Sequence, residues 1–302
     1  MSKGKRQSHR IRFVLVFVAG LSLVLFSIKA VRLVQSSVWD GAAHITIAID
    51  NGNIDVWSIE PKEKTISHVI IPANMYLSVP PSYGEYEARA VGKLSLLERG
   101  DGTLFQAAVS ETLAVPVDAY IVLHGDAGDK LKLDELFGLI GISKTNTSQW
   151  FSQRLTNLTF YDMLRLWLLS FSLKKEAIEV VYLADTDAVT RTDLPDQREI
   201  LMLDRSRFAT RAPSYFTDQK IVEEQLTIEV INGTEREGAA NSLALLLTNI
   251  GATVINTAKG EPAEQSVIFA KERSYTASKI AKLIGAELKR EAFQDSRADI
   301  TV

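Results

Sequence analysis

Two carboxylates, Asp50 and Asp55, flank an Asn-Gly pair and are close enough in sequence to bind a divalent cation together. Carboxylate oxygens are the ligands that Mg²⁺ prefers in proteins. Alternating side chains of a strand, however, point to opposite faces of a sheet, and an acid beside Asn-Gly is a common turn residue. We therefore interpret Asp50 as a hairpin residue in preference to a metal ligand.

Other residue types with catalytic chemistry form no convincing group. The chain has four histidines and no cysteine, and His44 and His68 lie in separate expected strands without a carboxylate at ligand spacing. His124 and Asp126 would need a serine nucleophile, but no Gly-x-Ser-x-Gly elbow is present. We expect no catalytic residue and no metal site.

The pattern of elements that must position these residues is mixed. Residues 44–50 and 54–59 alternate apolar and polar side chains on either side of Asn51-Gly52, which predicts a β-hairpin. Further strands are expected at 66–71, 117–123 and 177–183, and helices at 102–113, 131–140 and 161–171. Strands and helices that mix in this way predict an α/β (α+β) domain.

A set of large apolar side chains recurs at helical spacing near the third expected helix. Its members are Phe151, Leu164, Trp167, Leu168 and Phe171. We interpret them as core residues rather than as a surface for a ligand.

The C-terminal part has a clear order of elements. Strands are expected at 226–231, 252–255, 266–269 and 298–302, and helices at 238–250 and 275–283. This βαββαβ order is typical of a small split βαβ sandwich with two helices on one face. Residues 184–225 have only short apolar islands, and we interpret much of this stretch as a surface connection.

The N-terminus predicts a membrane anchor. Lys3, Lys5, Arg6, Arg10 and Arg12 precede an uncharged run at residues 13–28. With snorkelling Lys29 and Arg32, residues 13–34 can span a bilayer as one helix. The positive-inside rule then makes 1–12 a cytoplasmic tail and the bulk of the chain extracytoplasmic, in a single-pass protein of the cell membrane. A cleaved signal peptide is the alternative, but no small-x-small cleavage site follows the run.

Charge excludes one class of partner. Seven of the 34 Lys and Arg lie in residues 1–34, so the other 27 face all 37 Asp and Glu, and the exported part carries a formal charge of −10. This charge argues against binding to nucleic acid.

The C-terminal residues 225–302 contain a series of spaced motifs, namely Val230-Ile-Asn-Gly-Thr234, Gly238-Ala-Ala, residues 243–247, Gly251-Ala-Thr-Val254 and Ala298-Asp-Ile-Thr-Val302. With these motifs, this unit resembles the LytR C-terminal domain of bacterial envelope proteins.

Three motifs occur in residues 40–210: Ser58-Ile-Glu-Pro61, Ile70-Ile-Pro72 and Val115-Pro-Val-Asp-Ala-Tyr120. With these motifs, residues 40–210 resemble the LytR-CpsA-Psr family, and residues 211–224 are expected to form a linker between the two domains. The resemblance implies a membrane-anchored phosphotransferase that moves a glycopolymer from a polyprenyl pyrophosphate carrier to peptidoglycan with the help of Arg, Asp and Mg²⁺.

The chain departs from the family pattern where the chemistry should be. Ala73 and Asn74 stand where the family has Arg and Asp, so a phosphate clamp and a metal carboxylate are missing. Arg89 and Lys93 lie where the family places a helix start facing its lipid pocket. They are our candidate substrate-binding residues, and a solvated helix face is the alternative.

Two hypotheses follow. In the favoured one, the chain is a non-catalytic binding or scaffolding protein of cell-wall biogenesis that binds a cell-wall polymer or an envelope protein and needs no cofactor. In the other, it is an active phosphotransferase whose clamp has moved.

The charge imbalance around the expected span predicts topology. A tag placed after Val302 should be cleaved by protease added to intact spheroplasts, because residues 35–302 are expected outside the membrane. Protection of this tag, together with protection of a cytoplasmic control protein, would contradict the assignment.

Overall fold

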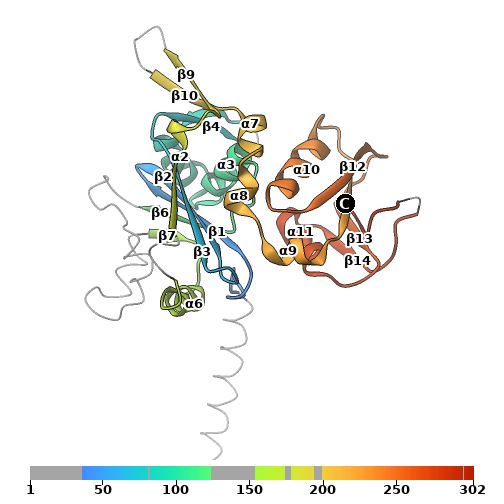
Figure 1. Ribbon diagram of the computed structural model, residues 1–302. Coiled ribbons are helices and arrows are strands. Elements are labelled where there is room, and N and C mark those ends of the chain that lie inside the picture. The colour runs from blue at the N-terminus through green and yellow to red at the C-terminus, as the bar shows by residue number, and fades with distance from the viewer. Residues whose placement is uncertain (1–35, 81, 124–153, 174–177, 194–198, 295) are drawn as a thin grey trace, which may run out of the picture.

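The computed structural model describes residues 36–80, 82–123, 154–173, 178–193, 199–294 and 296–302 (Figure 1). Among these residues no helix is both long and apolar enough to cross a membrane, and the expected span at 13–34 lies outside them. The expected helix at 131–140 also lies outside the described residues.

A six-stranded mixed sheet forms the centre of the larger domain, in the order β7-β6-β1-β2-β3-β8. Its strands are β1 (Ile45–Asn51), β2 (Asn53–Glu60), β3 (Thr65–Ile71), β6 (Ala119–Leu123), β7 (Arg154–Thr156) and β8 (Ile178–Tyr182). β1 and β2 form the expected antiparallel hairpin, with Gly52 at φ 84° in its turn. A positive φ strains any residue with a Cβ, so glycine suits this turn.

Each face of this sheet has its own core. On one face, α2 (Ala88–Arg99) and α3 (Thr103–Leu113) cover a core that includes Ala48, Val56 and Phe105. On the other, α6 (Phe160–Ser170) covers a core that includes Ile47, Met163 and Leu166. The alternation in β1 therefore separates two buried layers rather than a buried face from a wet one.

The stretch at 184–225 is more structured than its sequence predicts. It begins within the 3₁₀ turn η2 (Leu183–Asp185) and contains β9 (Val189–Asp193), β10 (Glu199–Leu203), α7 (Arg205–Ala209), α8 (Ala212–Phe216) and α9 (Gln219–Glu224). β9 and β10 join β4 (Met75–Val79) and β5 (Gly84–Glu87) in a second sheet, in the order β5-β4-β10-β9. Elements this short show no helical or strand periodicity, which explains why the sequence pattern missed them.

The C-terminal unit has the expected order of elements with one strand added. Its elements are β11 (Thr227–Asn232), α10 (Ala239–Asn249), β12 (Thr253–Lys259), β13 (Val267–Ala270), α11 (Tyr275–Ile284), β14 (Glu287–Lys289) and β15 (Ile300–Thr301). The sheet order is β12-β11-β15-β13-β14. Residues of both helices, among them Leu247 and Ile280, share one core with Ile228 of β11, so the two helices cover one face as expected.

The apolar set near α6 is not the core that we expected. Phe171 is 71% exposed and Leu168 is 55% exposed, while Leu164 and Trp167 are half-buried at the edge of the α6 core. Phe151 lies outside the described residues. Helical spacing shows that side chains share a side, but not whether that side is covered.

α9 packs as part of the C-terminal unit, although it precedes the strand at which we placed the boundary. Ile221 of α9 is 3% exposed in the core of that unit. The Glu224 carboxylate accepts hydrogen bonds from the backbone N–H groups of Tyr275 (2.7 Å) and Thr276 (2.8 Å). An anion at the first turn of α11 satisfies free donors and complements the helix dipole.

These contacts predict that α9 stabilises the unit. A fragment of residues 217–302 should melt cooperatively and at a higher temperature than one of residues 225–302. In the longer fragment, Glu224→Ala should cost about 1–2 kcal/mol of unfolding free energy, because it leaves two N–H groups unpaired. Glu223→Ala is the matched control, since its ion-pair partner Lys62 belongs to the other domain. Equal melting of the two fragments would contradict the role of α9.

Candidate functional site

Asp50 near the end of β1 faces α2 rather than solvent. Its cross-strand partner is Ile54, which is buried in the core beneath α2 and α3. A Cβ placed on Gly92 of α2 would lie 1.8 Å from Oδ2 of Asp50. The carboxylate therefore packs directly against α2 at Gly92, where a larger residue would force the Asp50 side chain to move.

The electrostatics of Asp50 follow from this burial. Desolvation raises its pKa to about 6, and the hydrogen bond from the Gly52 backbone N–H offsets part of this effect. Among the described residues, no lysine or arginine contributes to the shift. Asp50 is thus a carboxylate that approaches neutrality under mildly acidic conditions without a cationic partner.

Asp55 lies on the opposite face of the sheet, in contact with His68. Its Oδ1 is 2.9 Å from Nε2 of His68, and its Oδ2 accepts a hydrogen bond from Nδ2 of Asn51 at 2.9 Å. The His68 ring stacks on Trp57, with 3.7 Å between ring centroids. His68 therefore has the carboxylate partner that sequence spacing did not reveal, because the partner comes from the neighbouring strand.

The sheet separates the two carboxylates, so Asp50 and Asp55 cannot bind one cation together. Within the described ranges, no group of three or more His, Asp or Glu side chains is arranged to hold a metal ion.

Ala73 and Asn74 have structural partners. The N–H of Ala73 donates to Oδ1 of Asn53 at 3.0 Å, and its carbonyl accepts from the N–H of Arg89 at 3.2 Å. The Asn74 amide Nδ2 donates to the carbonyl of Glu199 at 3.2 Å. These two positions thus connect the end of the first sheet to α2 and to the second sheet.

The candidate residues Arg89 and Lys93 lie together on the exposed side of α2. Arg89 forms an ion pair with Glu87, the N-cap residue of that helix, and Lys93 is exposed one turn further on. The buried side of α2 is formed by Ala88, Val91 and Gly92 with Ser95. This placement matches the solvated helix face that we named as the alternative, and a phosphate contact at Arg89 and Lys93 stays a prediction.

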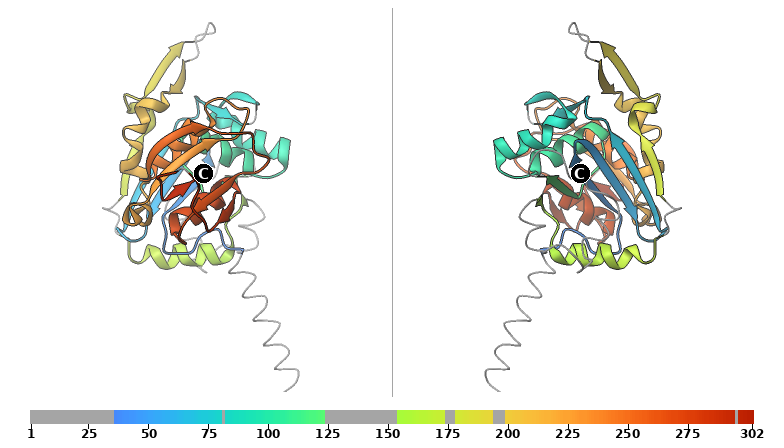
Figure 2. Two further views of the ribbon diagram at one scale, coloured as in Figure 1. Left: turned by 90° about the vertical axis from the view of Figure 1, so that its right-hand side faces the viewer. Right: turned by 90° about the vertical axis from the view of Figure 1, so that its left-hand side faces the viewer.

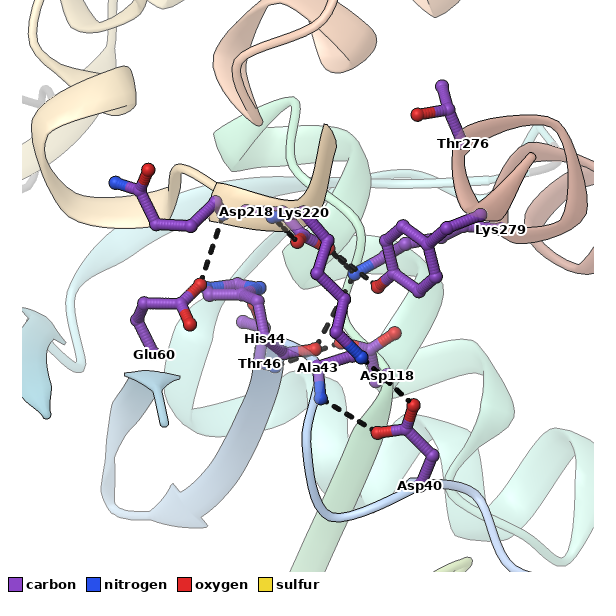
Figure 3. Close-up of polar contacts among 12 residues, drawn as sticks. Asp40, Ala43, His44, Thr46, Glu60, Asp118, Asp218, Lys220, Thr276 and Lys279 are labelled. Carbon is purple, nitrogen blue, oxygen red and sulfur yellow. Dashed lines mark hydrogen bonds and ion pairs between the residues drawn. The ribbon is translucent and has the colours of Figure 1, made fainter. Parts of the chain in front are cut away.

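A buried polar network that sequence reasoning missed lies where the C-terminal unit meets the larger domain (Figure 3). Nζ of Lys279 in α11 is 2.7 Å from Oδ2 of Asp218, whose side chain is fully buried. The Tyr275 hydroxyl donates to the same oxygen at 2.7 Å. Asp218 also caps α9 by accepting from the N–H of Lys220.

The charges of this network stabilise each other. Burial alone would raise the pKa of Asp218, but the charge of Lys279 and hydrogen bonds from Lys279 and Tyr275 outweigh it and hold that pKa below its usual value. Burial would lower the pKa of Lys279, but the charges of Asp118 and Asp218 raise it instead. Both groups are therefore charged over the whole physiological range.

The network reaches the larger domain through the residue before β1. Nζ of Lys279 lies 3.5 Å from the carbonyl of His44, and Nε2 of His44 is 2.7 Å from Oγ of Ser58. Burial, followed by the nearby charge of Lys279, lowers the pKa of His44 to about 3, so the ring is neutral. The same interface includes a hydrogen bond from Nδ2 of Asn249 in α10 to the carbonyl of Ala114, at 2.8 Å.

Beside this interface is a cleft of about 450 Å³ between α3 and the helices of the C-terminal unit. Its apolar lining includes Ala107, Leu246 and Ile284. Arg205, whose Nη1 is 3.0 Å from Oε1 of Glu111, gives it a charged edge. Thr103, Gln106, Ser110 and Ser242 also line it, so the cleft is mixed in polarity.

Comparison with known proteins identifies the C-terminal unit. Residues 225–302 match the family model LytR_C, described as "LytR cell envelope-related transcriptional attenuator". The expected LytR C-terminal domain is therefore confirmed. No curated protein matches the chain.

Solved structures similar to the chain include members of the LytR-CpsA-Psr family, which residues 40–210 resemble. Bacillus subtilis TagT is 14% identical, with a TM-score of 0.39 and coverage of 57% of this chain and 89% of that one. A structure described as LytR-CPS2A-psr family protein YwtF (TagT) with bound octaprenyl pyrophosphate lipid has a TM-score of 0.38 at 14% identity and the same coverage. Lin1025 from Listeria innocua is 12% identical, with a TM-score of 0.39 and coverage of 56% and 95%.

The burial of the Asp50 carboxyl group predicts that the folding stability depends on pH. The folded pKa of Asp50, about 6, lies above the unfolded value of 3.8. The contribution of this carboxyl group to folding stability is therefore fully present below pH 3.8 and is lost as the pH rises through about 6. Asp50→Asn should therefore raise the melting temperature at pH 7.5, through a stabilisation of about 2–3 kcal/mol, and should leave it unchanged near pH 4. Asp193→Asn, at an exposed position of β9, is the control that should show no such difference. Loss of stability in Asp50→Asn at pH 7.5 would show that the carboxylate has a cationic partner.

Proposed function

We propose that this chain is a non-catalytic, membrane-anchored protein of the bacterial cell envelope that binds or positions a component of the cell wall. The observation that carries the proposal is the placement of Asp50 and Asp55 on opposite faces of the sheet, together with the structural partners of Ala73 and Asn74. Phosphoryl transfer needs metal and cationic groups converging on one pyrophosphate. Among the described residues, no group of three His, Asp or Glu side chains could hold a metal ion, and no lysine or arginine acts on Asp50.

The C-terminal unit supports a role in the envelope. Its family is described by its relation to the cell envelope, and the same description mentions transcriptional attenuation. The formal charge of −10 on the exported part argues against direct contact with nucleic acid. We therefore assign this unit to an envelope partner and place it outside the membrane, on the anchor expected at residues 13–34.

The contact between the two domains supports a binding role rather than a catalytic one. The contact of Lys279 with the carbonyl of His44 and the Asn249–Ala114 hydrogen bond hold the C-terminal unit against the larger domain, and the cleft beside α3 lies between them. A fixed cleft can present one surface to a wall polymer without moving. Under this proposal the protein needs no cofactor. Mg²⁺ would be required only under the alternative, in which the chain is an active transferase.

The proposal predicts binding without turnover. Full-length protein in detergent should co-sediment with purified cell-wall sacculi, yet should release no pyrophosphate-linked saccharide from a polyprenyl carrier with or without Mg²⁺. Ala73→Arg combined with Asn74→Asp should raise the affinity for inorganic pyrophosphate in the presence of Mg²⁺, because it adds a guanidinium and a carboxylate. Arg191→Ala with Asp193→Asn, in the exposed strand β9, is a matched double control.

Two outcomes would contradict the proposal. Turnover by the unmodified protein that chelation of the metal abolishes would establish a relocated active site. Failure to sediment with sacculi under conditions that keep the protein folded would remove the wall as its partner.

A further inference from the structure

The outward side of α6 carries a stripe of large apolar side chains. We call Phe160, Leu164, Trp167, Leu168 and Phe171 the outer stripe. At about 100° per residue, their spacing places all five on one side of the helix. Phe160, Leu168 and Phe171 are 52%, 55% and 71% exposed, and Leu164 and Trp167 are half-buried beside them.

The opposite side of α6 is already occupied. Met163 and Leu166 are buried in the core under the sheet, at 2% and 0% exposure. A surface helix normally carries polar residues on its outward side. α6 instead has two apolar sides, and the ring of Phe171 packs edge-on against Trp167 with 4.9 Å between centroids. An exposed cluster of this kind marks a contact surface.

The start of the described chain is fixed to this same helix. The buried carboxylate of Asp162 accepts hydrogen bonds from the N–H groups of Val38 (3.2 Å) and Trp39 (3.0 Å), and from the hydroxyl of Ser37. Nη1 of Arg165 donates to Oγ of Ser37 at 2.8 Å. Figure 2 shows α6 lying along the end of the molecule where the described chain begins.

The expected membrane span ends close to this attachment. Val34 is the last residue of that span, and two residues, Gln35 and Ser36, lie between it and Ser37. Even fully extended, the three residue steps from Val34 to Ser37 cover at most about 11 Å. The interfacial layer of a bilayer is roughly 5–7 Å thick on each side, and a helix with its side chains is about 10 Å wide. Ser37, and α6 with it, is therefore held within reach of the lipid head groups.

We propose that α6 lies in the membrane interface, with its outer stripe inserted among the lipids of the outer leaflet. This inference rests on the anchor of the proposed function. Tryptophan and phenylalanine on one side of a helix are typical of helices that lie in the plane of the interface. The anchor holds α6 at a high effective concentration next to the bilayer, so even a short helix binds there.

The absence of cysteine allows a direct test on the full-length protein. Single cysteines at positions 168 and 171 carry a nitroxide label, and the protein is placed in nanodiscs of phosphatidylcholine and phosphatidylglycerol. The collision rate of each nitroxide with oxygen, which concentrates in lipid, is compared with its collision rate with a water-soluble nickel complex. Leu97→Cys is the matched control, because Leu97 is 82% exposed on α2. Leu21→Cys reports on the anchor itself.

We expect a severalfold higher ratio of oxygen to nickel collision at positions 168 and 171 than at position 97, and a high ratio at position 21. A lipid-like ratio at position 21 with water-like ratios at 168 and 171 would overturn the inference and leave the anchor in place. A water-like ratio at position 21 would overturn the anchor and, with it, the inference. Low collision with both reagents at 168 and 171 would show that protein, such as a second copy of the chain, covers the outer stripe, and would also overturn it.

Discussion

The contact between the two domains is built around the buried ion pair of Lys279 and Asp218 in the C-terminal unit, since Nζ of Lys279 also lies 3.5 Å from the carbonyl of His44 in the larger domain. Two charges taken out of water carry a large desolvation penalty, which is offset only when the pair is close and its remaining hydrogen-bonding groups are satisfied. Tyr275, the carbonyl of His44 and the first turn of α9 supply those partners. Because these partners come from the C-terminal unit and from the larger domain, losing any one of them leaves a buried charged group with a hydrogen bond unmade.

The connection between the domains is itself packed at both ends. Phe216 of α8 is buried in the core of the larger domain, and Ile221 of α9 is buried in the core of the C-terminal unit. A segment that we expected to be a linker therefore contributes to two cores. This leaves little free chain between the domains, so a change in their relative position would require one of these side chains to leave its core.

Local periodicity accounts for what could be predicted from the sequence. The β1–β2 hairpin follows from alternating strands around an Asn-Gly turn, and α3, α10 and α11 follow from apolar side chains at helical spacing. The contact of His68 with Asp55 could not be predicted, because it depends on the register between two strands. The burial of Asp50 depends on which residue of a distant helix lies above it. The outer stripe of α6 was assigned to the core because a pattern of apolar side chains does not reveal which side of a helix the rest of the fold covers.

The contact between Asp50 and Gly92 constrains how this chain can change over generations. Any side chain at position 92 would collide with the carboxylate at position 50, and the full carboxylate at position 50 leaves no room for one. A mutation that enlarges position 92 should therefore be accepted only after position 50 has become smaller. Among descendants of a common ancestral chain, these two positions should vary together, so natural selection would leave a trace of this contact in their sequences.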